Sequence, residues 1–231
     1  MFSLLSNFFT WLFSKNEVHI LVLGLDAAGK TTFIEQSKTI IRRRAPGAGG
    51  GVPLDRIPPT VGLNIARIDV DSTRVIMWDL GGQTMLRSIW SKYYAEANGL
   101  IFVVDSCSPP ERFDEARDTL RGLLAHPELD RVPFLLCCNK QDSMNSHSSV
   151  EIDKLMGFVS SCQQQNRAHR VQPMSALTGA GVEDTVRWIV DAANAMGPRK
   201  PASSAAAAAS GGTSATANRT PPGNNRAIVV S

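Results

Sequence analysis

The stretch Gly24-Leu25-Asp26-Ala27-Ala28-Gly29-Lys30-Thr31 decides how this chain folds. It fits the pattern G-x-x-x-x-G-K-[ST], and it lies between an apolar run over 18–23 and a helical pattern over 30–41. In that context, successive backbone N–H groups form a concave anion site at the start of a helix. We expect the Lys30 ammonium to reach the β- and γ-phosphates of a nucleotide and the Thr31 hydroxyl to bind Mg²⁺, with Thr32 in the same site.

Apolar runs and helical patterns alternate along the chain around this loop. The runs that predict strands cover 18–23, 63–70, 73–79, 100–104, 132–138 and 171–174. The patterns that predict helices cover 30–41, 85–93, 150–159 and 182–193, and Ser108-Pro109-Pro110-Glu111 predicts a further helix that starts with a capping box. Because strands that alternate with helices pair in parallel, the sequence predicts an α/β fold with a mostly parallel sheet between two layers of helices.

The length and composition fit one folded domain with additional segments at its ends. The chain has 231 residues, 43% of them hydrophobic, which is enough for one sizeable core. Its formal net charge is +3, but four basic residues and no acidic ones lie in 197–231, so the remainder is nearly neutral. A nucleic-acid-binding domain needs a basic face, so we expect no nucleic acid among the partners.

The two ends of the chain differ from its middle. Residues 1–15 place Phe, Trp and Leu around a polar stripe of Ser, Asn and Thr, which predicts an amphipathic helix too short to span a bilayer. We expect this helix to bind a membrane surface through residues 2–14, and the alternatives are a helix docked on the core and a signal peptide. We assign 16–197 to the folded domain and 198–231, which is of low complexity, to a disordered tail.

A second motif, Asn139-Lys140-Gln141-Asp142, follows a predicted strand and selects the base. It therefore lies at the carboxyl edge of the sheet, where folds of this class bind ligands. The Asp142 carboxylate can accept hydrogen bonds from the N1–H and 2-amino groups of guanine, and adenine has neither donor at that place. The Lys140 stem can cover the face of the base. Ser175 and Ala176 follow the next strand, and the Ala176 N–H can bind the guanine O6.

A third group of residues would act on the γ-phosphate. Asp79 ends a predicted strand and would hold Mg²⁺ through a water molecule. The N–H of Gly82 would contact the γ-phosphate, since glycine allows a close approach. Gln83 would be the catalytic residue that orients the attacking water. Thr60 would give Mg²⁺ a second hydroxyl and a link to the γ-phosphate.

The segments GLDAAGKT, PTVGLN, WDLGGQ, NKQD and SAL, in this order and spacing, resemble the Arf and Arf-like branch of the small GTPases. The resemblance covers about 1–197, and the segments MFSLLSNFF, TVGLNIARIDV and KYYAEANG are most similar to the ADP-ribosylation-factor-related protein subgroup. It implies the P-loop small-GTPase fold with a six-stranded sheet. It also implies an enzyme that binds GTP or GDP with Mg²⁺ and hydrolyses GTP slowly until a partner stimulates it.

The resemblance further implies a membrane switch. With GDP bound, the N-terminal helix would lie in a groove of the domain, and GTP would shift the strand pair 63–79 in register and release the helix onto the membrane. Leu63, Trp78 and Tyr93 would form an effector surface. The implied partners are an exchange factor, a GTPase-activating protein and trafficking effectors. The implied state is a cytoplasmic monomer that associates reversibly with Golgi or trans-Golgi membranes.

Phe2 departs from the pattern of the Arfs proper, in which glycine at this position carries a myristoyl group. One amphipathic helix without a lipid is a weak anchor, so a second contact is needed. The subgroup resemblance suggests an acetylated Met1 and an integral membrane receptor. The loop over 45–57 and the tail are longer than in typical Arfs. Two alternatives stay open: a GTP-binding scaffold with negligible hydrolysis, and an ATP-dependent kinase, which Asn139 and Asp142 oppose.

Overall fold

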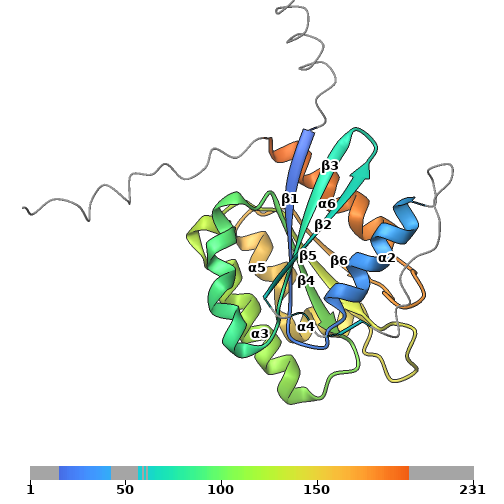
Figure 1. Cartoon of the computed structure of the whole chain (residues 1–231). Helices are drawn as coiled ribbons and strands as arrows, with labels where there is room; N and C mark the ends of the chain where they lie inside the picture. Colours follow the sequence, from blue (N-terminus) through green and yellow to red (C-terminus); the bar gives the residue numbers. More distant parts are fainter. Residues whose placement is uncertain (1–15, 43–56, 59, 61, 198–231) are drawn as a thin grey trace, which may run out of the picture. The chain divides into compact units, whose positions relative to one another are not determined.

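The structure is a computed structural model that describes residues 16–42, 57, 58, 60 and 62–197 (Figure 1). The predicted amphipathic helix over 1–15, the predicted tail over 198–231 and nearly all of the 45–57 loop lie outside these described residues. No helix within the described ranges is long and apolar enough to cross a bilayer.

In the described part of the chain, six strands form one sheet in the order β2-β3-β1-β4-β5-β6 (Figure 1). The pair β2 and β3 is antiparallel, and the other neighbouring pairs are parallel. This confirms the predicted six-stranded, mostly parallel sheet. The strand order reverses on the two sides of β1, so the carboxyl end of β1 is a point where a ligand can enter the sheet edge. The strands are β1 (Asn16–Leu23), β2 (Leu63–Val70), β3 (Thr73–Leu80), β4 (Gly99–Asp105), β5 (Phe134–Asn139) and β6 (His169–Pro173).

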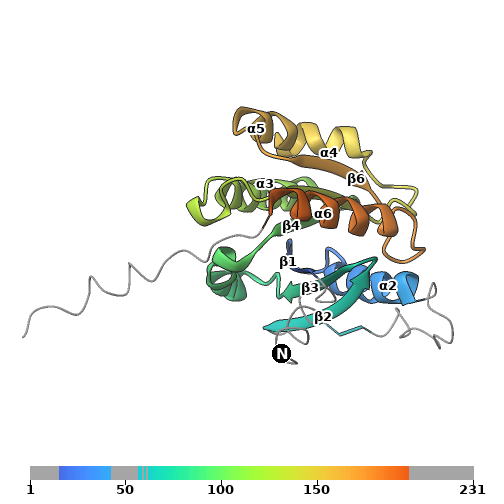
Figure 2. The same ribbon diagram turned by 90° about the horizontal axis from the view of Figure 1, so that it is seen from above.

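Helices cover both faces of the sheet, as Figures 1 and 2 show. One face packs against α2 (Lys30–Arg42) and α6 (Val182–Met196). The other face packs against α3 (Pro110–Leu124), α4 (Ser149–Met156), α5 (Phe158–Gln164) and two 3-10 segments, η2 (Thr84–Glu96) and η3 (Pro127–Leu129). The sheet is therefore buried on both faces. This explains why its central strands are continuous apolar runs rather than alternating patterns.

The segment after Gln83 differs from the helix predicted over 85–93. It forms the 3-10 segment η2, which buries Trp90 and Tyr94 and leaves Met85 90% exposed. A 3-10 segment has three residues per turn, so its inward positions do not follow the 3.6-residue period on which the prediction relied.

Two predicted helix boundaries are also wrong. The helix predicted over 150–159 is two helices, because Gly157 between them has a φ of +61° and ends the first. The capping box predicted at Ser108 does not form, since Pro109 is the N-cap of α3 and makes no side-chain cap. A capping box forms instead at the start of α4, between Ser148 and Glu151.

Candidate nucleotide-binding site

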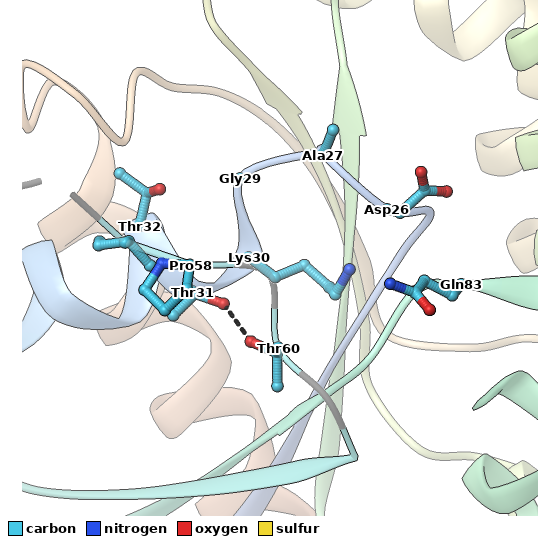
Figure 3. A pocket seen from close by; sticks show the side chains of 11 residues that line it. Asp26, Ala27, Gly29, Lys30, Thr31, Thr32, Pro58, Thr60 and Gln83 are labelled. Atoms are coloured by element: carbon cyan, nitrogen blue, oxygen red, sulfur yellow. Dashed lines mark hydrogen bonds between the residues drawn. The ribbon is translucent and has the colours of Figure 1, made fainter. Parts of the chain in front are cut away.

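The loop over 24–31 joins the end of β1 to the start of α2 and bends around a cavity (Figure 3). Gly24, Ala27 and Gly29 have positive φ values of +140°, +58° and +93°. Such alternation turns successive N–H groups toward one side of the loop and makes a concave anion site. A Cβ atom on Gly24 would lie 2.2 Å from the carbonyl oxygen of Val103 in β4, so this position accepts glycine alone.

The cavity has a volume of about 360 Å³ and is lined by most of the residues predicted to bind phosphate and metal. Leu25 and Ala28, also predicted, have their side chains buried in the core, and Gly24 lies at the start of the loop. Ile57 and Pro58 complete the described lining and were not predicted. The predicted residues that line the cavity are Asp26, Ala27, Gly29, Lys30, Thr31, Thr32, Thr60, Gly82 and Gln83.

The Lys30 side chain lies along the loop that precedes it. Its ammonium donates hydrogen bonds to the carbonyl oxygens of Gly24 (3.0 Å) and Leu25 (2.8 Å), and the residue is 6% exposed. Burial lowers the pKa of Lys30 to about 8, although the carboxylates of Asp79 and Asp26 oppose this shift. A phosphate in the cavity would stabilise the charged ammonium, because an anion offsets the cost of burying a cation.

Three oxygen atoms from three separate segments meet beside Lys30. Thr31 Oγ1 donates to Asp79 Oδ2 at 2.7 Å, Thr60 Oγ1 lies 3.1 Å from the same oxygen, and the two hydroxyls are 2.7 Å apart (Figure 3). Burial raises the pKa of Asp79, and the hydrogen bond from Thr31 opposes this shift. The second carboxylate oxygen, Asp79 Oδ1, is buried with no hydrogen-bond partner in the described part of the chain. Two hydroxyls beside a carboxylate are hard oxygen ligands, so these three residues fit Mg²⁺.

Gly82 and Gln83, on the segment that follows β3, also line the cavity. A Cβ atom on Gly82 would lie 2.4 to 2.5 Å from backbone atoms of Leu25, Asp26 and Gly24. The glycine is therefore needed for contact between two protein segments, a requirement beyond the predicted contact with phosphate. Gln83 is exposed, and Figure 3 shows its amide directed toward the side of the cavity where the Lys30 ammonium lies.

The residues predicted to bind the base stand on two loops, after β5 and after β6. Asp142 Oδ1 accepts a hydrogen bond from Ser175 Oγ at 2.5 Å, which joins the two loops. Lys140 Nζ donates to Asp105 Oδ2 at 2.6 Å, at the end of β4. A smaller cavity of about 180 Å³ is lined in part by Asp142 and Ser175. The structure thus brings the Asp142 carboxylate and the Lys140 stem to the sheet edge on which the phosphate loop lies.

The Asn139 side chain makes contacts between two loops that the sequence motif did not predict. It is buried, its Nδ2 donates to the Ala28 carbonyl oxygen at 2.8 Å, and its Oδ1 accepts from the Ala176 N–H at 2.9 Å. Gly29 packs against it so closely that a Cβ there would lie 2.3 Å from Asn139 Nδ2. Asn139 therefore ties the phosphate loop to the loop after β6. Its predicted contact with the nucleotide stays a prediction.

The three residues predicted as an effector surface lie together on one face. The Trp78 ring centroid is 5.3 Å from that of Tyr93 and 4.7 Å from that of His19. Leu63 and Tyr93 are half-buried, whereas Trp78 is 6% exposed. In this arrangement Leu63 and Tyr93 offer more surface than Trp78, and their role toward an effector stays a prediction.

A chain of charged side chains next to the cavity was not predicted. It runs from Asp26 in the phosphate loop through Arg112 and Glu115 of α3 to Arg87 of η2. Arg112 and Glu115 are three residues apart on α3, a spacing that places them on one helix face. The sequence carries that local signal, but it does not show that Asp26 and Arg87 lie at the two ends.

Comparison with known proteins agrees with this geometry. The model of the ADP-ribosylation factor family matches residues 3–193. ADP-ribosylation factor-related protein 1 of Rattus norvegicus is 43% identical over 190 residues, which cover 82% of this chain and 92% of the relative. ADP-ribosylation factor-like protein 3 of Saccharomyces cerevisiae is 40% identical over 191 residues, with the same coverage of 82% and 92%.

A solved structure shares the fold. The small GTPase Arl6 (BBS3) of Trypanosoma brucei, solved with the bound nucleotide analogue GppNp, matches with a TM-score of 0.66 and 25% sequence identity. The match covers 78% of this chain and 99% of the trypanosome chain. With the phosphate loop, the converging oxygens and these relatives in agreement, the chain belongs to the ADP-ribosylation factor family and is a small GTPase that hydrolyses GTP.

Proposed function

We propose that this chain is a GTP/GDP switch that is recruited to Golgi or trans-Golgi membranes and acts in vesicle trafficking. The observation that carries the proposal is the junction of Thr31, Thr60 and Asp79 in the cavity wall. Thr60 precedes β2 and Asp79 belongs to β3, so the junction couples the phosphate loop to both strands of one hairpin. Gain or loss of a γ-phosphate there would change the position of the whole hairpin.

The chemistry of the proposed site follows from its residues. The phosphate loop and Lys30 bind the phosphates, and Asp142 binds the edge of guanine while Lys140 covers its face. The Ala176 N–H, which the sequence predicted as a donor to the guanine O6, donates to Asn139 Oδ1 instead. Thr31 and Thr60, with Asp79 through water, would hold Mg²⁺, which when bound neutralises charge on the phosphate oxygens. The Gly82 N–H donates to the γ-phosphate.

Hydrolysis in this site is proposed to be slow. Gln83 orients the attacking water, but the described lining of the cavity contains no arginine to stabilise charge on the transferred group. Such an arginine is worth about 10³ to 10⁵ in rate. We therefore infer that a GTPase-activating protein supplies the missing stabilisation and that an exchange factor reloads the site with GTP.

The proposed output is membrane binding by residues 2–14 in the GTP state, together with an integral membrane receptor and with effectors that contact Leu63, Trp78 and Tyr93. β1 begins at Asn16 and pairs with β3 in a defined register, from Asn16 opposite Thr73 to Val22 opposite Asp79. A change in that register would act directly on the segment that precedes β1. Nucleotide exchange and membrane release would then be one event.

Liposome flotation tests the switch. Full-length protein loaded with GDP or with a non-hydrolysable GTP analogue is floated with liposomes and, separately, with purified Golgi membranes. We expect flotation in the GTP state, and its loss when residues 2–14 are deleted. Equal flotation in both states would contradict the switch, because equal affinity shifts no equilibrium. Binding to Golgi membranes but not to liposomes would support the receptor.

A single-turnover hydrolysis assay tests the catalytic assignment. We expect slow release of phosphate from bound GTP and no measurable release in Gln83→Leu, whereas both proteins should retain GDP equally well. Normal hydrolysis in Gln83→Leu would contradict the role given to Gln83. The control is Asn98→Ala on a loop before β4, whose side chain accepts one hydrogen bond from the His19 N–H and does not line the cavity.

A further inference from the structure

We propose that Glu115 of α3 is a positioning residue for GTP hydrolysis. It stands at the centre of a chain of four side chains, Asp26–Arg112–Glu115–Arg87, which we call the relay. The relay fixes the segment that carries Gln83 relative to the phosphate loop. The inference deepens the proposed function, because it rests on the role of Gln83 in orienting water.

Each connection in the relay has the geometry of a charge-assisted hydrogen bond. Arg112 Nη2 donates to Asp26 Oδ1 at 2.9 Å and to the Asp26 carbonyl oxygen at 3.0 Å. Arg112 Nη1 donates to one oxygen of Glu115 at 2.8 Å, and Arg87 Nη2 donates to the other oxygen at 2.7 Å. Arg87 Nε then donates to the Gly82 carbonyl oxygen at 2.8 Å. Both oxygens of one carboxylate are thus used to join two arginines.

The two ends of the relay lie on two segments that both line the nucleotide cavity and that pack against each other at Gly82. Asp26 belongs to the phosphate loop, and Gly82 directly precedes Gln83. Arg112, Glu115 and Arg87 do not line the cavity, and the first two belong to α3, a helix of 15 residues. A segment of 3-10 structure such as η2 has weaker hydrogen-bond geometry than an α-helix. We infer that the bond from Arg87, near the start of η2, to Glu115 of α3 restricts the movement of the adjoining Gln83.

The relay contributes little to stability, which allows its role in positioning to be separated from a role in folding. Its side chains are between 15% and 50% exposed. Ion pairs of that exposure add little to the free energy of folding. Misplacement of a reacting group by about 1 Å, in contrast, can cost about 100-fold in rate. Loss of the relay should therefore reduce the hydrolysis rate much more than it reduces stability.

The test compares Glu115→Gln with a matched control, Asp114→Asn. Asp114 is the neighbouring residue on α3 and pairs with Arg117 at 2.7 Å, with the same three-residue spacing as Arg112 and Glu115, but this pair does not reach the cavity. Single-turnover hydrolysis of bound GTP, the dissociation rate of GDP and the melting temperature are measured for each. We expect Glu115→Gln to hydrolyse about tenfold more slowly, with GDP release within about twofold of the wild type and a near-unchanged melting temperature. Asp114→Asn should match the wild type.

A double-mutant cycle on the hydrolysis rate distinguishes a positioning role of the relay from a merely structural one. Arg87→Ala and Arg112→Ala remove the two halves of the relay, which meet at Glu115. If the relay acts as a unit, the double variant should lose no more rate than either single variant. Multiplied losses would overturn the proposal, as would a wild-type hydrolysis rate in Glu115→Gln.

Two further outcomes distinguish a failure of the relay proposal from a failure of the role given to Gln83. If Gln83→Leu hydrolyses GTP normally, the catalytic assignment fails and the relay has nothing to position. If Gln83→Leu is inactive and Glu115→Gln is unaffected, the relay alone fails. Should Glu115→Gln be recovered unfolded, Arg87→Lys replaces it, since lysine keeps the charge but cannot donate to Gly82 and Glu115 with the same geometry. Parallel loss of GDP retention and rate in that variant would overturn the proposal.

Discussion

Replacement of Asn139 by alanine should destabilise the protein through the loss of one buried side chain that bonds to two loops. The amide donates to the Ala28 carbonyl oxygen and accepts from the Ala176 N–H, at 2.8 and 2.9 Å. Alanine removes both bonds and leaves two backbone groups in a buried site. The loss should appear as a lower free energy of unfolding and as faster release of GDP, because the two loops belong to the two halves of the nucleotide site.

The magnitude follows from the number of groups left without a partner. A buried polar group that loses its partner costs about 1–3 kcal/mol, so two such groups cost about 2–6 kcal/mol. Entry of water into the space left by the amide would bring the loss to the lower end of that range. With a urea m-value of about 2 kcal/mol per molar, the unfolding midpoint should fall by about 1–3 M.

The assay is urea unfolding followed by tryptophan fluorescence at a series of GDP concentrations with constant Mg²⁺. The series is needed because bound nucleotide adds stability by mass action and the variant binds it less well. Asn98→Ala is the control, since the Asn98 side chain accepts a single hydrogen bond, 2.8 Å from the His19 N–H, at a half-buried position. If Asn139→Ala loses no more stability than Asn98→Ala, the two bonds of Asn139 do not hold the loops together with the expected energy.

Four other changes have outcomes that the structure specifies. Asp142→Asn should bind xanthine nucleotides in preference to guanine nucleotides. The Asn amide can donate a hydrogen bond to the 2-oxo group of xanthine, which replaces the 2-amino group of guanine, and a competition assay between GTP and XTP would measure the change. Asp79→Asn should weaken Mg²⁺ binding about 10- to 100-fold, measured as the Mg²⁺ dependence of GDP release, and an unchanged dependence would remove Asp79 from the metal site. Gly24→Ala should yield no soluble nucleotide-bound protein, because its Cβ would lie 2.2 Å from the Val103 carbonyl oxygen. Gly122→Ala, on an exposed position of α3 with open space around it, should instead raise the free energy of unfolding by about 0.5–1 kcal/mol in urea titration, and a destabilised variant would contradict this expectation.

Several features could be predicted from the chain alone because the physical signal was local. The phosphate loop is such a case: its glycines, its lysine and its position between a strand and a helix are contiguous in the sequence. The strand pair 63–70 and 73–79 was also predicted closely, as β2 and β3 end within one residue of those limits. Other local predictions failed. No capping box forms at Ser108, although the same type of local signal at Ser148 and Glu151 does form one, and the helix expected after Gln83 is a 3-10 segment.

The 3-10 segment shows why such failures occur. Trp90 Nε1 donates to the Gly81 carbonyl oxygen at 3.0 Å, and Arg87 Nε donates to the Gly82 carbonyl oxygen. Both bonds connect side chains of η2 to the two glycines that follow β3. Such side-chain bonds to the backbone compete with a regular α-helix, and helix propensity is too weak to override them. The buried positions then become Trp90 and Tyr94 rather than a stripe with a 3.6-residue period.

By itself, the sequence determined the fold class, the phosphate loop and the types of residue in the candidate site, since each of these depends on residues that are close along the chain or on their order. The tertiary structure alone decided which groups meet: the convergence of Thr31, Thr60 and Asp79, and the tie made by Asn139. The relay from Asp26 to Arg87 likewise joins residues from three elements. Contacts between segments far apart in sequence depend on how strands pair and helices pack, and a short sequence motif does not predict this pairing and packing.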